Sequence, residues 1–475
     1  MPPHFLDWLD RVDADRVAVI DDRTSITYGE LRESARSVAG SLAGRYGTGR
    51  FLLLPAERTV RFVRLLCAVS LSGNVPVPLD PQAPESLIRQ LAEPCGDWEL
   101  LRAEDGEPDG TPGIDRRDAA APALVMFTSG TSGVPKGVVV TQANLAHSMQ
   151  AIGSYLNYVE FDSAAVVLPL HYSYSLLSQV FCMFAVGGRS RLFESFRNPI
   201  RFAKEVDQLR IRTFCGVPST YQALCTLRRM TPVVMPEVRV ICSAGAAMDR
   251  RLMPEIRQIF PNAVFFDNYG MTEATPRVTF IRDDDPRFAE PTCGRPIAGL
   301  ELRILGERDL APVAEGEPGI VAVRGPSVFP GYLNDPEATA EAFTPDGFLL
   351  SADLGYLRDG YLYIVGRRDD VFNVGGEKVA PLEIERVLAT HADVEYCAVN
   401  GLDDPQRGMV PVAYVKLRQP APRKALVEFL SARLPAAKVP GRYFEVEQFP
   451  MTANGKLQRA RLAPDAPGLA AREIH

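Results

Sequence analysis

The repeated order of strand, helix and strand is the feature that most constrains the fold of this chain. A strand-like run at 25–28 precedes apolar residues at helical spacing, and another helical pattern leads into the apolar run 213–217. A further helix, opened by Asp249, is predicted between the apolar runs 238–243 and 263–266. This alternation predicts an α/β fold, built on a parallel sheet with helices on both faces.

After this region the pattern becomes rich in β-strands. The Asp-Gly pair at 359–360 lies between two apolar runs and predicts a two-residue hairpin turn. A polar segment, 366–370, then precedes a compact alternation of helical and strand-like patterns. We therefore expect a large N-terminal region of α/β subdomains with a β-rich portion, residues 1–367. A small C-terminal α+β domain, residues 368–475, should follow, and its tail from Ala463 is expected to fray.

The composition excludes several classes of protein. The chain has 475 residues, of which 46% are hydrophobic and 23% charged, so it is neither disordered nor fibrous. Its 52 basic and 59 acidic residues give a net charge of −7, which provides no broad positive field for a nucleic acid. The eight cysteines include no CxxC pair. Without a signal peptide or a membrane-spanning run, we expect a cytoplasmic protein with reduced thiols.

The segment FTSGTSGVPKG, residues 127–137, has the composition of a phosphate-binding loop. Its glycines let the backbone approach an anion, its hydroxyl and N–H groups donate to phosphate oxygens, and Lys136 supplies positive charge. The segment lies between two apolar, strand-like runs, which is not expected of a flexible linker. It lacks the glycine before the lysine and the Ser or Thr after it that define a Walker loop.

This loop resembles the phosphate loop of the ANL superfamily of adenylate-forming enzymes. That superfamily contains acyl-CoA synthetases, adenylation domains of peptide synthetases and beetle luciferases. Further segments are similar to the remaining family motifs and occur in the family's order. They are ITYGEL (26–31), GNVPVPLDPQAP (73–84), NYGMTEA (268–274), RGPSVFPGYLNDPEAT (324–339), GFLLSADLGYLRDGYLYIVGRRDD (347–370), GGEKVAPLEIE (375–385) and PMTANGKLQR (450–459).

The resemblance implies roles for residues that contact ATP and Mg²⁺. Tyr269 would stack on adenine, Asp267 would accept a hydrogen bond from its amine, and Thr272 would contact the α-phosphate. Glu273, which with Thr272 belongs to the implied catalytic set, would hold Mg²⁺, because this hard cation prefers carboxylate oxygens and phosphates. Asp353 is similar to the ribose-binding aspartate, although Ser-Ala precedes it in place of the usual Thr-Gly. The other implied nucleotide-binding positions are Thr128, Ser129, Gly130, Thr131, Ser132, Gly133, Lys136, Ala244, Gly245, Asn268, Gly270 and Arg367.

Lys456 is similar to the catalytic lysine of the family. A carboxylate that attacks an anionic phosphate is repelled by like charge, and an ammonium group that contacts both offsets the repulsion. Asp369 matches the hinge about which the small domain turns, while Gly376 and Lys378 match the tunnel for the thiol. The resemblance therefore implies a two-step mechanism in which the small domain alternates between adenylation and thioester formation.

The acyl pocket is the least determined part of the site. His171, Tyr172 and Ser173 occupy the position of the family's acyl-side motif, in the segment PLHYSYSLL. Adenylation domains for α-amino acids usually carry an aspartate here, and this segment has none. The predicted substrate is therefore an aryl, alkyl or hydroxy acid without an α-amino group. His171 either lines the pocket or is a hydrogen-bonded core histidine, and the sequence supports both interpretations equally.

The leading interpretation is an acyl- or aryl-CoA ligase. Such an enzyme converts a small carboxylic acid and Mg-ATP into acyl-AMP and pyrophosphate, and coenzyme A then displaces AMP. A stand-alone adenylation enzyme, which would load the phosphopantetheine thiol of a separate carrier protein in natural-product biosynthesis, is the alternative. A luciferase-like oxygenase would have the same adenylation motifs. A nucleotide-binding relic would lack a catalytic group, whereas Lys136, Glu273, Asp353 and Lys456 are all present.

Overall fold

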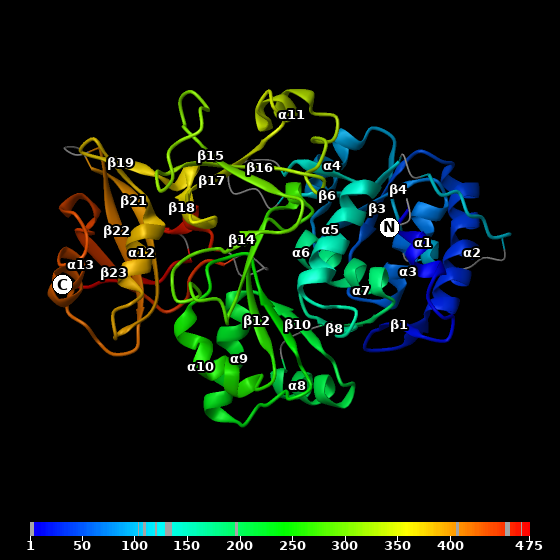
Figure 1. Ribbon diagram of the computed structural model, residues 1–475, viewed down its shortest axis with the longest axis horizontal. Helices are drawn as coiled ribbons and strands as arrows, with labels where there is room; N and C mark the ends of the chain where they lie inside the picture. Colours follow the sequence, from blue (N-terminus) through cyan, green and yellow to red (C-terminus); the bar gives the residue numbers. More distant parts are fainter. Residues whose placement is uncertain are drawn as a thin grey trace. The chain divides into compact units, whose positions relative to one another are not determined.

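The computed structural model describes residues 4–102, 104–107, 111–118, 121–128, 135–194, 198–404, 408–451, 457–466 and 468–475. Contacts divide the chain into two compact units. The first unit comprises Met1–Leu302 and Val323–Leu349, and the second comprises Arg303–Ala322 and Leu350–His475. Figure 1 labels many of the elements of both units. The predicted domain boundary between residues 367 and 368 stays a prediction.

A nine-stranded sheet forms the centre of the first unit, in the order β14-β13-β12-β11-β10-β8-β9-β1-β2. The six strands from β12 to β1 are parallel, and antiparallel strands flank them at both ends. The strands are β1 (Val17–Ile20), β2 (Ser25–Thr27), β8 (Ser163–Val166), β9 (Arg189–Leu192), β10 (Thr213–Gly216), β11 (Val240–Ser243), β12 (Val264–Tyr269), β13 (Thr279–Arg282) and β14 (Arg295–Pro296). The predicted α/β class is confirmed.

Helices cover both faces of this sheet, because neighbouring side chains of one strand point to opposite faces. Phe265 and Ile241 belong to one apolar cluster, whereas Phe266 and Cys242, the next residues along the same strands, belong to another. The helices of the unit are α1 (Leu6–Asp10), α2 (Tyr28–Tyr46), α3 (Val60–Leu71), α4 (Glu85–Ala92), α5 (Gln142–Tyr155), α6 (Ser173–Ser175), α7 (Cys182–Val186), α8 (Pro199–Gln208), α9 (Pro218–Met230), α10 (Met253–Ile259) and α11 (Pro336–Ala342), with a π-helical segment, η3 (Leu176–Phe181), between α6 and α7.

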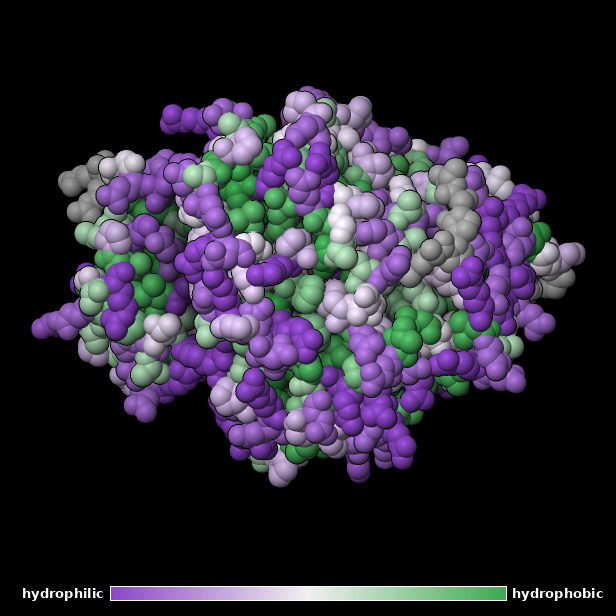
Figure 2. Space-filling model, in the orientation of Figure 1, coloured by the Kyte–Doolittle hydropathy of each residue, from purple (hydrophilic) through white to green (hydrophobic). Residues whose placement is uncertain are grey.

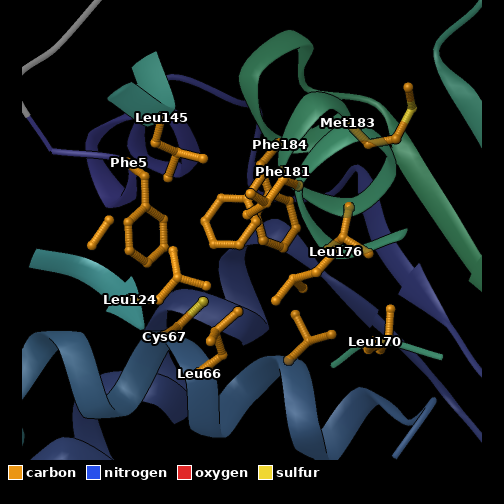
Figure 3. Packing of buried hydrophobic residues seen from close by; sticks show 14 of the residues in the cluster. Phe5, Leu66, Cys67, Leu124, Leu145, Leu170, Leu176, Phe181, Met183 and Phe184 are labelled. Atoms are coloured by element: carbon orange, nitrogen blue, oxygen red, sulfur yellow. The ribbon is translucent and has the colours of Figure 1, made fainter. Parts of the chain in front are cut away.

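Aromatic and aliphatic side chains pack together in the larger cluster. Phe181 of η3 and Phe184 of α7 meet near Leu124 and Leu145 (Figure 3). The ring of Phe5 packs edge-on against Phe181, with 4.9 Å between the ring centroids. Such aromatic pairs add to the stabilisation that area burial alone provides.

Two smaller sheets complete the first unit. One is parallel and contains β3 (Phe51–Pro55), β4 (Val75–Leu79) and β5 (Trp98–Leu100). The other is the antiparallel pair of β6 (Pro122–Phe127) and β7 (Gly137–Thr141). The strands β6 and β7 flank the predicted phosphate loop.

The second unit contains a six-stranded sheet and most of a four-stranded one. The four-stranded sheet consists of β15 (Glu301–Leu305), β16 (Gly319–Arg324), β17 (Leu349–Arg358) and β18 (Tyr361–Arg367). The six-stranded sheet contains β19 (Phe372–Val374), β20 (Glu377–Val379), β21 (Val394–Asp404), β22 (Gly408–Leu417), β23 (Arg442–Val446) and β24 (Ala471–Glu473), with helices α12 (Pro381–Leu388) and α13 (Arg423–Ser431). The hairpin predicted at 359–360 is confirmed, since Arg358 pairs with Tyr361 across it.

The prediction that the tail from Ala463 frays is wrong for its last residues. β24 pairs antiparallel with the edge strand β23, and the main-chain N–H of Ile474 donates to Tyr443 at 2.8 Å. Arg442 and Glu473 form an ion pair across the two strands, with 2.8 Å between Nε and Oε1. The edge of β23 presents unpaired N–H and C=O groups, and the tail satisfies them.

The cysteines are almost entirely inside the protein. Seven of the eight are buried, and Cys293 is partly exposed. Burial raises the pKa of the Cys67 thiol to about 12 and that of Cys95 to about 11. Both groups are therefore protonated thiols at neutral pH.

Hydrophilic residues cover most of the face shown in Figure 2, with hydrophobic residues interspersed. Scattered apolar residues are normal on a globular surface. No helix in the described parts of the chain is long and apolar enough to cross a membrane.

Deleting residues 470–475 tests the contribution of β24. Because the deletion exposes the edge of β23 and removes the cover of Ile474, we expect the melting temperature to fall by about 2–6 °C, as for a loss of about 1–2 kcal/mol. Glu473→Gln is the matched control, since it keeps the strand and alters only a partly exposed ion pair. An unchanged melting temperature of the truncated protein would show that β24 adds no stability.

Candidate functional site

The parallel strands bring several of the predicted site residues of the first unit to one edge of the sheet. β8, β10, β11 and β12 run in the same direction and pair in register, so their carboxyl ends lie side by side. His171 follows β8, Ala244 follows β11, and Gly270 follows β12. Ligands of open α/β sheets bind outside the carboxyl ends of the strands. This edge is the candidate active site.

Buried polar atoms without a partner occur in the segments that leave this edge. Within the described residues, no hydrogen bond reaches Ser243 Oγ, Thr275 Oγ1, His171 Nδ1, or Nε and Nη2 of Arg277. Leaving a buried polar group unsatisfied costs about 1–3 kcal/mol. A polar ligand at this edge would remove that cost.

A direct hydrogen bond joins two of the predicted segments. Ser173, from the acyl-side motif, and Thr272, the implied α-phosphate residue, have their hydroxyl oxygens 3.0 Å apart. The next residue, Tyr174, donates its hydroxyl to the main-chain oxygens of Gly216 and Cys242, each at 3.2 Å, at the ends of β10 and β11. The acyl-side segment is thereby fixed to three strand ends.

The environment of His171 favours a neutral ring. Its ring lies 4.2 Å from that of Tyr172, and burial lowers the pKa of His171 from its ordinary value. Both side chains are half-buried. Burial likewise raises the pKa of the Tyr172 hydroxyl, so this pair presents an uncharged aromatic surface.

Asp267 lies near the end of β12 in the implied adenine site. Its carboxylate is 14% exposed, and Arg250 Nη2 lies 3.4 Å from Oδ2. Burial raises the pKa of the Asp267 carboxyl to about 6, and the charge of Arg250 offsets only part of this effect. Beside Asp267 in the register, Ser243 ends β11 and leads to Ala244 and Gly245. Gly245 has a φ of +90°, which favours glycine in this turn.

Two other implied nucleotide residues have clear structural contacts. Asn268 is buried and donates its side-chain amide to the main-chain oxygens of Ser243, at 3.1 Å, and Phe266, at 3.0 Å, while its carbonyl accepts from Tyr155. A Cβ at Gly270 would lie 1.9 Å from the main-chain oxygen of Pro276. These contacts hold the strand end and the following loop. Nucleotide contacts by Asn268, Gly270 and Tyr269 stay predictions.

The two ends of the phosphate loop are held together. The main-chain N–H of Thr128 donates to the oxygen of Lys136 at 3.1 Å, and the Lys136 N–H donates to the Thr128 hydroxyl at 3.2 Å. Ser129, Gly130, Thr131, Ser132 and Gly133 lie outside the described residues.

Tyr332, which was not among the predicted site residues, connects two of them. Its hydroxyl donates to Glu273 Oε1 at 3.0 Å, and the ammonium of Lys136 lies 5.1 Å from the centre of its ring. Tyr332 is brought there because Leu333 pairs with Gly137 of β7 through a main-chain bond of 2.8 Å. Tyr332 lies in segment 324–339, which is similar to a family motif. The motif does not predict the contact with Glu273, and only the fold reveals it.

Glu273 provides a donor that suits Mg²⁺. It is partly exposed in the turn η5 (Thr272–Ala274), whose position is fixed by a main-chain bond of 2.9 Å from Phe329 to the oxygen of Glu273. A carboxylate oxygen is the protein ligand that Mg²⁺ prefers in combination with phosphates. The chemistry of this carboxylate therefore fits Mg²⁺, and the roles of Glu273 as the metal ligand and of Lys136 at the phosphates stay predictions.

In the second unit, the implied ribose residues Asp353 and Arg367 are direct cross-strand partners of β17 and β18. Directly opposite residues of an antiparallel pair share one face of the sheet. The hydroxyl of Ser351 accepts from the main-chain N–H of Asp353 at 3.1 Å. Ser351 thus retains a hydroxyl next to the aspartate, although the motif departs from Thr-Gly-Asp.

The hinge and tunnel positions are also in the second unit. Asp369 is exposed in the short turn η6 (Arg368–Asp370), and Gly376 lies in the turn between β19 and β20. Lys378 Nζ forms an ion pair with Glu307 Oε1 at 2.5 Å. Their roles in rotation and thiol access stay predictions.

Lys456 lies outside the described residues, and its predicted role is untested. The described residues on either side, Met451 and Leu457, form an antiparallel bridge. Arg459, two residues further on, pairs with Asp370 at 3.2 Å and with Glu385 of α12 at 2.6 Å. Arg459 thus anchors the segment that follows the lysine to η6 and α12.

Comparison with known proteins identifies the class. The sequence matches the AMP-binding enzyme family over residues 6–101 and 92–333, and the AMP-binding enzyme C-terminal domain over residues 383–456. The chain therefore belongs to the AMP-binding enzyme family, which confirms the resemblance to the ANL superfamily. It is an ATP-dependent, AMP-forming acid–thiol ligase that uses Mg²⁺.

Individual relatives match over nearly their full lengths. The chain is 32% identical to a 2-succinylbenzoate–CoA ligase of Geobacillus kaustophilus, covering 94% of each chain. It is 27% identical to a 4-coumarate–CoA ligase of Pinus taeda, covering 94% of this chain and 92% of the relative. The structure of o-succinylbenzoate CoA synthetase from Bacillus subtilis with its acyl-adenylate intermediate matches with a TM-score of 0.87 and 26% identity, covering 100% of this chain and 99% of that one.

Tyr332→Phe tests the link between Glu273 and the phosphate loop. Losing the hydroxyl that holds Glu273 should lower the adenylation rate about tenfold, because a hydrogen bond to a charged group is worth about 1.5 kcal/mol or more. We also expect a higher Mg²⁺ concentration at half-maximal rate. The measurement is pyrophosphate release against Mg²⁺ concentration.

Tyr46→Phe is the matched control for Tyr332→Phe, since the Tyr46 hydroxyl also donates to a carboxylate, that of Asp105, at 3.0 Å. Tyr46 lies at the end of α2 and not at the candidate site. If both variants release pyrophosphate at the same rate and need the same Mg²⁺ concentration, Tyr332 does not hold Glu273 for catalysis.

The raised pKa of Asp267 predicts a pH dependence of nucleotide binding. Because this carboxyl titrates near pH 6, it gains a proton as the pH falls from 7 to 5 and loses acceptor strength for the adenine amine. The ATP affinity of the natural protein should then approach that of Asp267→Asn, in which the position never carries charge. Calorimetry measures the dissociation constant of ATP for both proteins across this range. The titration of the ATP phosphates affects both constants equally, so it cancels in their ratio. A constant ratio would contradict the assigned role.

Proposed function

We propose that this ligase activates an aryl or alkyl carboxylic acid without an α-amino group and transfers the acyl group to coenzyme A. The hydrogen bond between Ser173 and Thr272 is the observation that carries the proposal. It connects the implied acyl pocket directly to the implied α-phosphate site. His171 and Tyr172 supply a neutral aromatic surface next to it, which suits the apolar skeleton of the acid.

In the first half-reaction, a carboxylate oxygen of the acid attacks the α-phosphorus of ATP. An acyl–O–P bond forms, and the bond to the pyrophosphate oxygen breaks. Thr272 donates to the α-phosphate, Lys136 pairs with the outer phosphates, and Lys456 offsets the repulsion between the two anions. Mg²⁺, held by Glu273, would neutralise phosphate charge.

In the second half-reaction, the thiol sulfur of coenzyme A attacks the acyl carbonyl carbon. A C–S bond forms, AMP leaves with the electron pair of the C–O bond, and the thiol proton passes to solvent. The exposed hinge residue Asp369 would allow the small domain to exchange its adenylation face for its thiolation face. Gly376 and Lys378 would then line the thiol path.

The test is pyrophosphate release with ATP, Mg²⁺ and a panel of carboxylic acids, with and without coenzyme A. We expect release to accelerate with coenzyme A and the acyl thioester to appear by mass spectrometry. Slow release with coenzyme A, accelerated instead by a carrier protein bearing phosphopantetheine, would reassign the acceptor. No acid-dependent release would overturn the proposed activity.

Lys456→Ala should lower adenylation by about 100-fold or more, because the like-charge repulsion is no longer offset. The melting temperature should stay unchanged if the lysine acts on the reacting groups and not on the fold. Lys424→Ala is the matched control. The Lys424 side chain is 84% exposed on α13, and its ion pair with Glu428 is a long contact, with 3.8 Å between Nζ and Oε1. Full adenylation activity in Lys456→Ala would remove this lysine from the catalytic set.

A further inference from the structure

Arg277 is a buried cation at the candidate site without a direct anionic partner. Its side chain belongs to a residue that is only 1% exposed, in the segment between η5 and β13. Within the described residues, Nε and Nη2 have no hydrogen-bond partner, and the guanidinium forms no ion pair. An arginine stays protonated under all ordinary conditions. Burying such a charge is costly unless it is paired.

The contacts of Arg277 place it next to the acyl-side segment. The guanidinium carbon lies 4.6 Å from the centre of the Tyr174 ring, a cation–π contact. Tyr174 is partly exposed and directly follows Ser173, which bonds to Thr272 at 3.0 Å. Arg277 therefore contacts the residue next to the Ser173–Thr272 hydrogen bond.

The protein's own acidic groups do not neutralise Arg277 directly. Asp267 is influenced by its charge, but that carboxylate lies against Arg250 at 3.4 Å. The charge of Arg277 also helps to lower the pKa of Cys215, after the larger effect of the hydrogen bond with Cys242. Cys215 is therefore the titratable group whose contribution a test has to separate.

The two unpartnered nitrogens indicate what would bind. Nε–H and the adjacent Nη2–H point in parallel from one edge of the planar guanidinium. That edge matches the two oxygens of a carboxylate in a bidentate ion pair. An uncharged hydroxyl or a thioether would satisfy only one donor and would leave the charge unpaired.

We propose that Arg277 binds a second carboxylate of the substrate, so that this enzyme activates dicarboxylic acids. One carboxylate reacts with the α-phosphorus near Thr272, and the other pairs with Nε and Nη2 of Arg277 beside the Tyr174 ring. This inference rests on the proposed function, since it specifies the acid that the same site activates. It assigns Arg277 as the specificity-determining residue of the acyl pocket.

The experiment compares matched pairs of acids with one skeleton and one or two carboxylates. Suitable pairs are butanoate and succinate, hexanoate and adipate, and benzoate with its three dicarboxylate isomers. For at least one skeleton, we expect the natural enzyme to have a kcat/KM for pyrophosphate release about tenfold or more higher with the diacid. Turnover of monocarboxylates with no preference for any diacid would overturn the inference and leave the proposed function intact. No turnover of any acid would overturn both.

Substitutions test whether Arg277 causes the preference for diacids. In Arg277→Met the diacid preference should fall to about one, mainly through a higher KM, whereas Arg277→Lys should keep part of it. Arg282→Met is the matched control, because Arg282 also packs over a ring, that of Phe266 at 5.7 Å, but pairs with Asp284 and is 46% exposed. Cys215→Ala should keep the preference. Loss of the preference in Cys215→Ala with retention in Arg277→Met would overturn the assignment.

A binding measurement provides a readout that does not depend on turnover. The preferred diacid, without ATP, should raise the melting temperature of the natural protein more than its matched monoacid does, because a ligand that binds only the folded state stabilises it. This difference should disappear in Arg277→Met. If that variant does not fold, the acid panel and the melting shifts of the natural protein still test whether the site binds a second carboxylate. Equal shifts for diacid and monoacid would contradict a site for the second carboxylate.

Discussion

Parallel pairing of β8, β10, β11 and β12 is the constraint on which the first unit depends. Strands that run in one direction must release their following segments at one edge, so residues separated by about a hundred positions become neighbours. The bond between Ser173 and Thr272 is the direct result. The chemistry of the site thus follows from strand direction, and helices cover both faces of the sheet.

Local patterns were sufficient to predict several elements of this fold. Strand-like runs, helical spacing and the turn at 359–360 depend on neighbouring residues, and the structure places the expected strands and helices there. The tail was mispredicted because Ala and Pro content describes intrinsic preference only. Pairing with the open edge of β23 overrides that preference, and this edge is formed by residues far from the tail in sequence.

Site residues could be predicted only where a motif carried them. Glu273, Asp353 and Lys136 stand in recognisable segments, whereas Tyr332 and Arg277 acquire their significance from contacts. An isolated tyrosine or arginine is normally a packing or surface residue. Tyr332 reaches Glu273 because its segment pairs with β7, and Arg277 is notable because it is buried without a direct partner. Neither the contact of Tyr332 nor the burial of Arg277 can be predicted from the spacing of residues in the sequence.

The burial of the cysteines has a consequence for an enzyme that makes reactive acyl groups. Acyl adenylates and thioesters transfer their acyl group to an accessible thiolate, and an enzyme's own side chain is the nearest available target. Seven of the eight cysteines are buried, and the raised pKa of Cys67 and Cys95 keeps these two protonated. Self-acylation at sulfur is thereby suppressed at Cys67 and Cys95, and burial limits access to the other buried thiols.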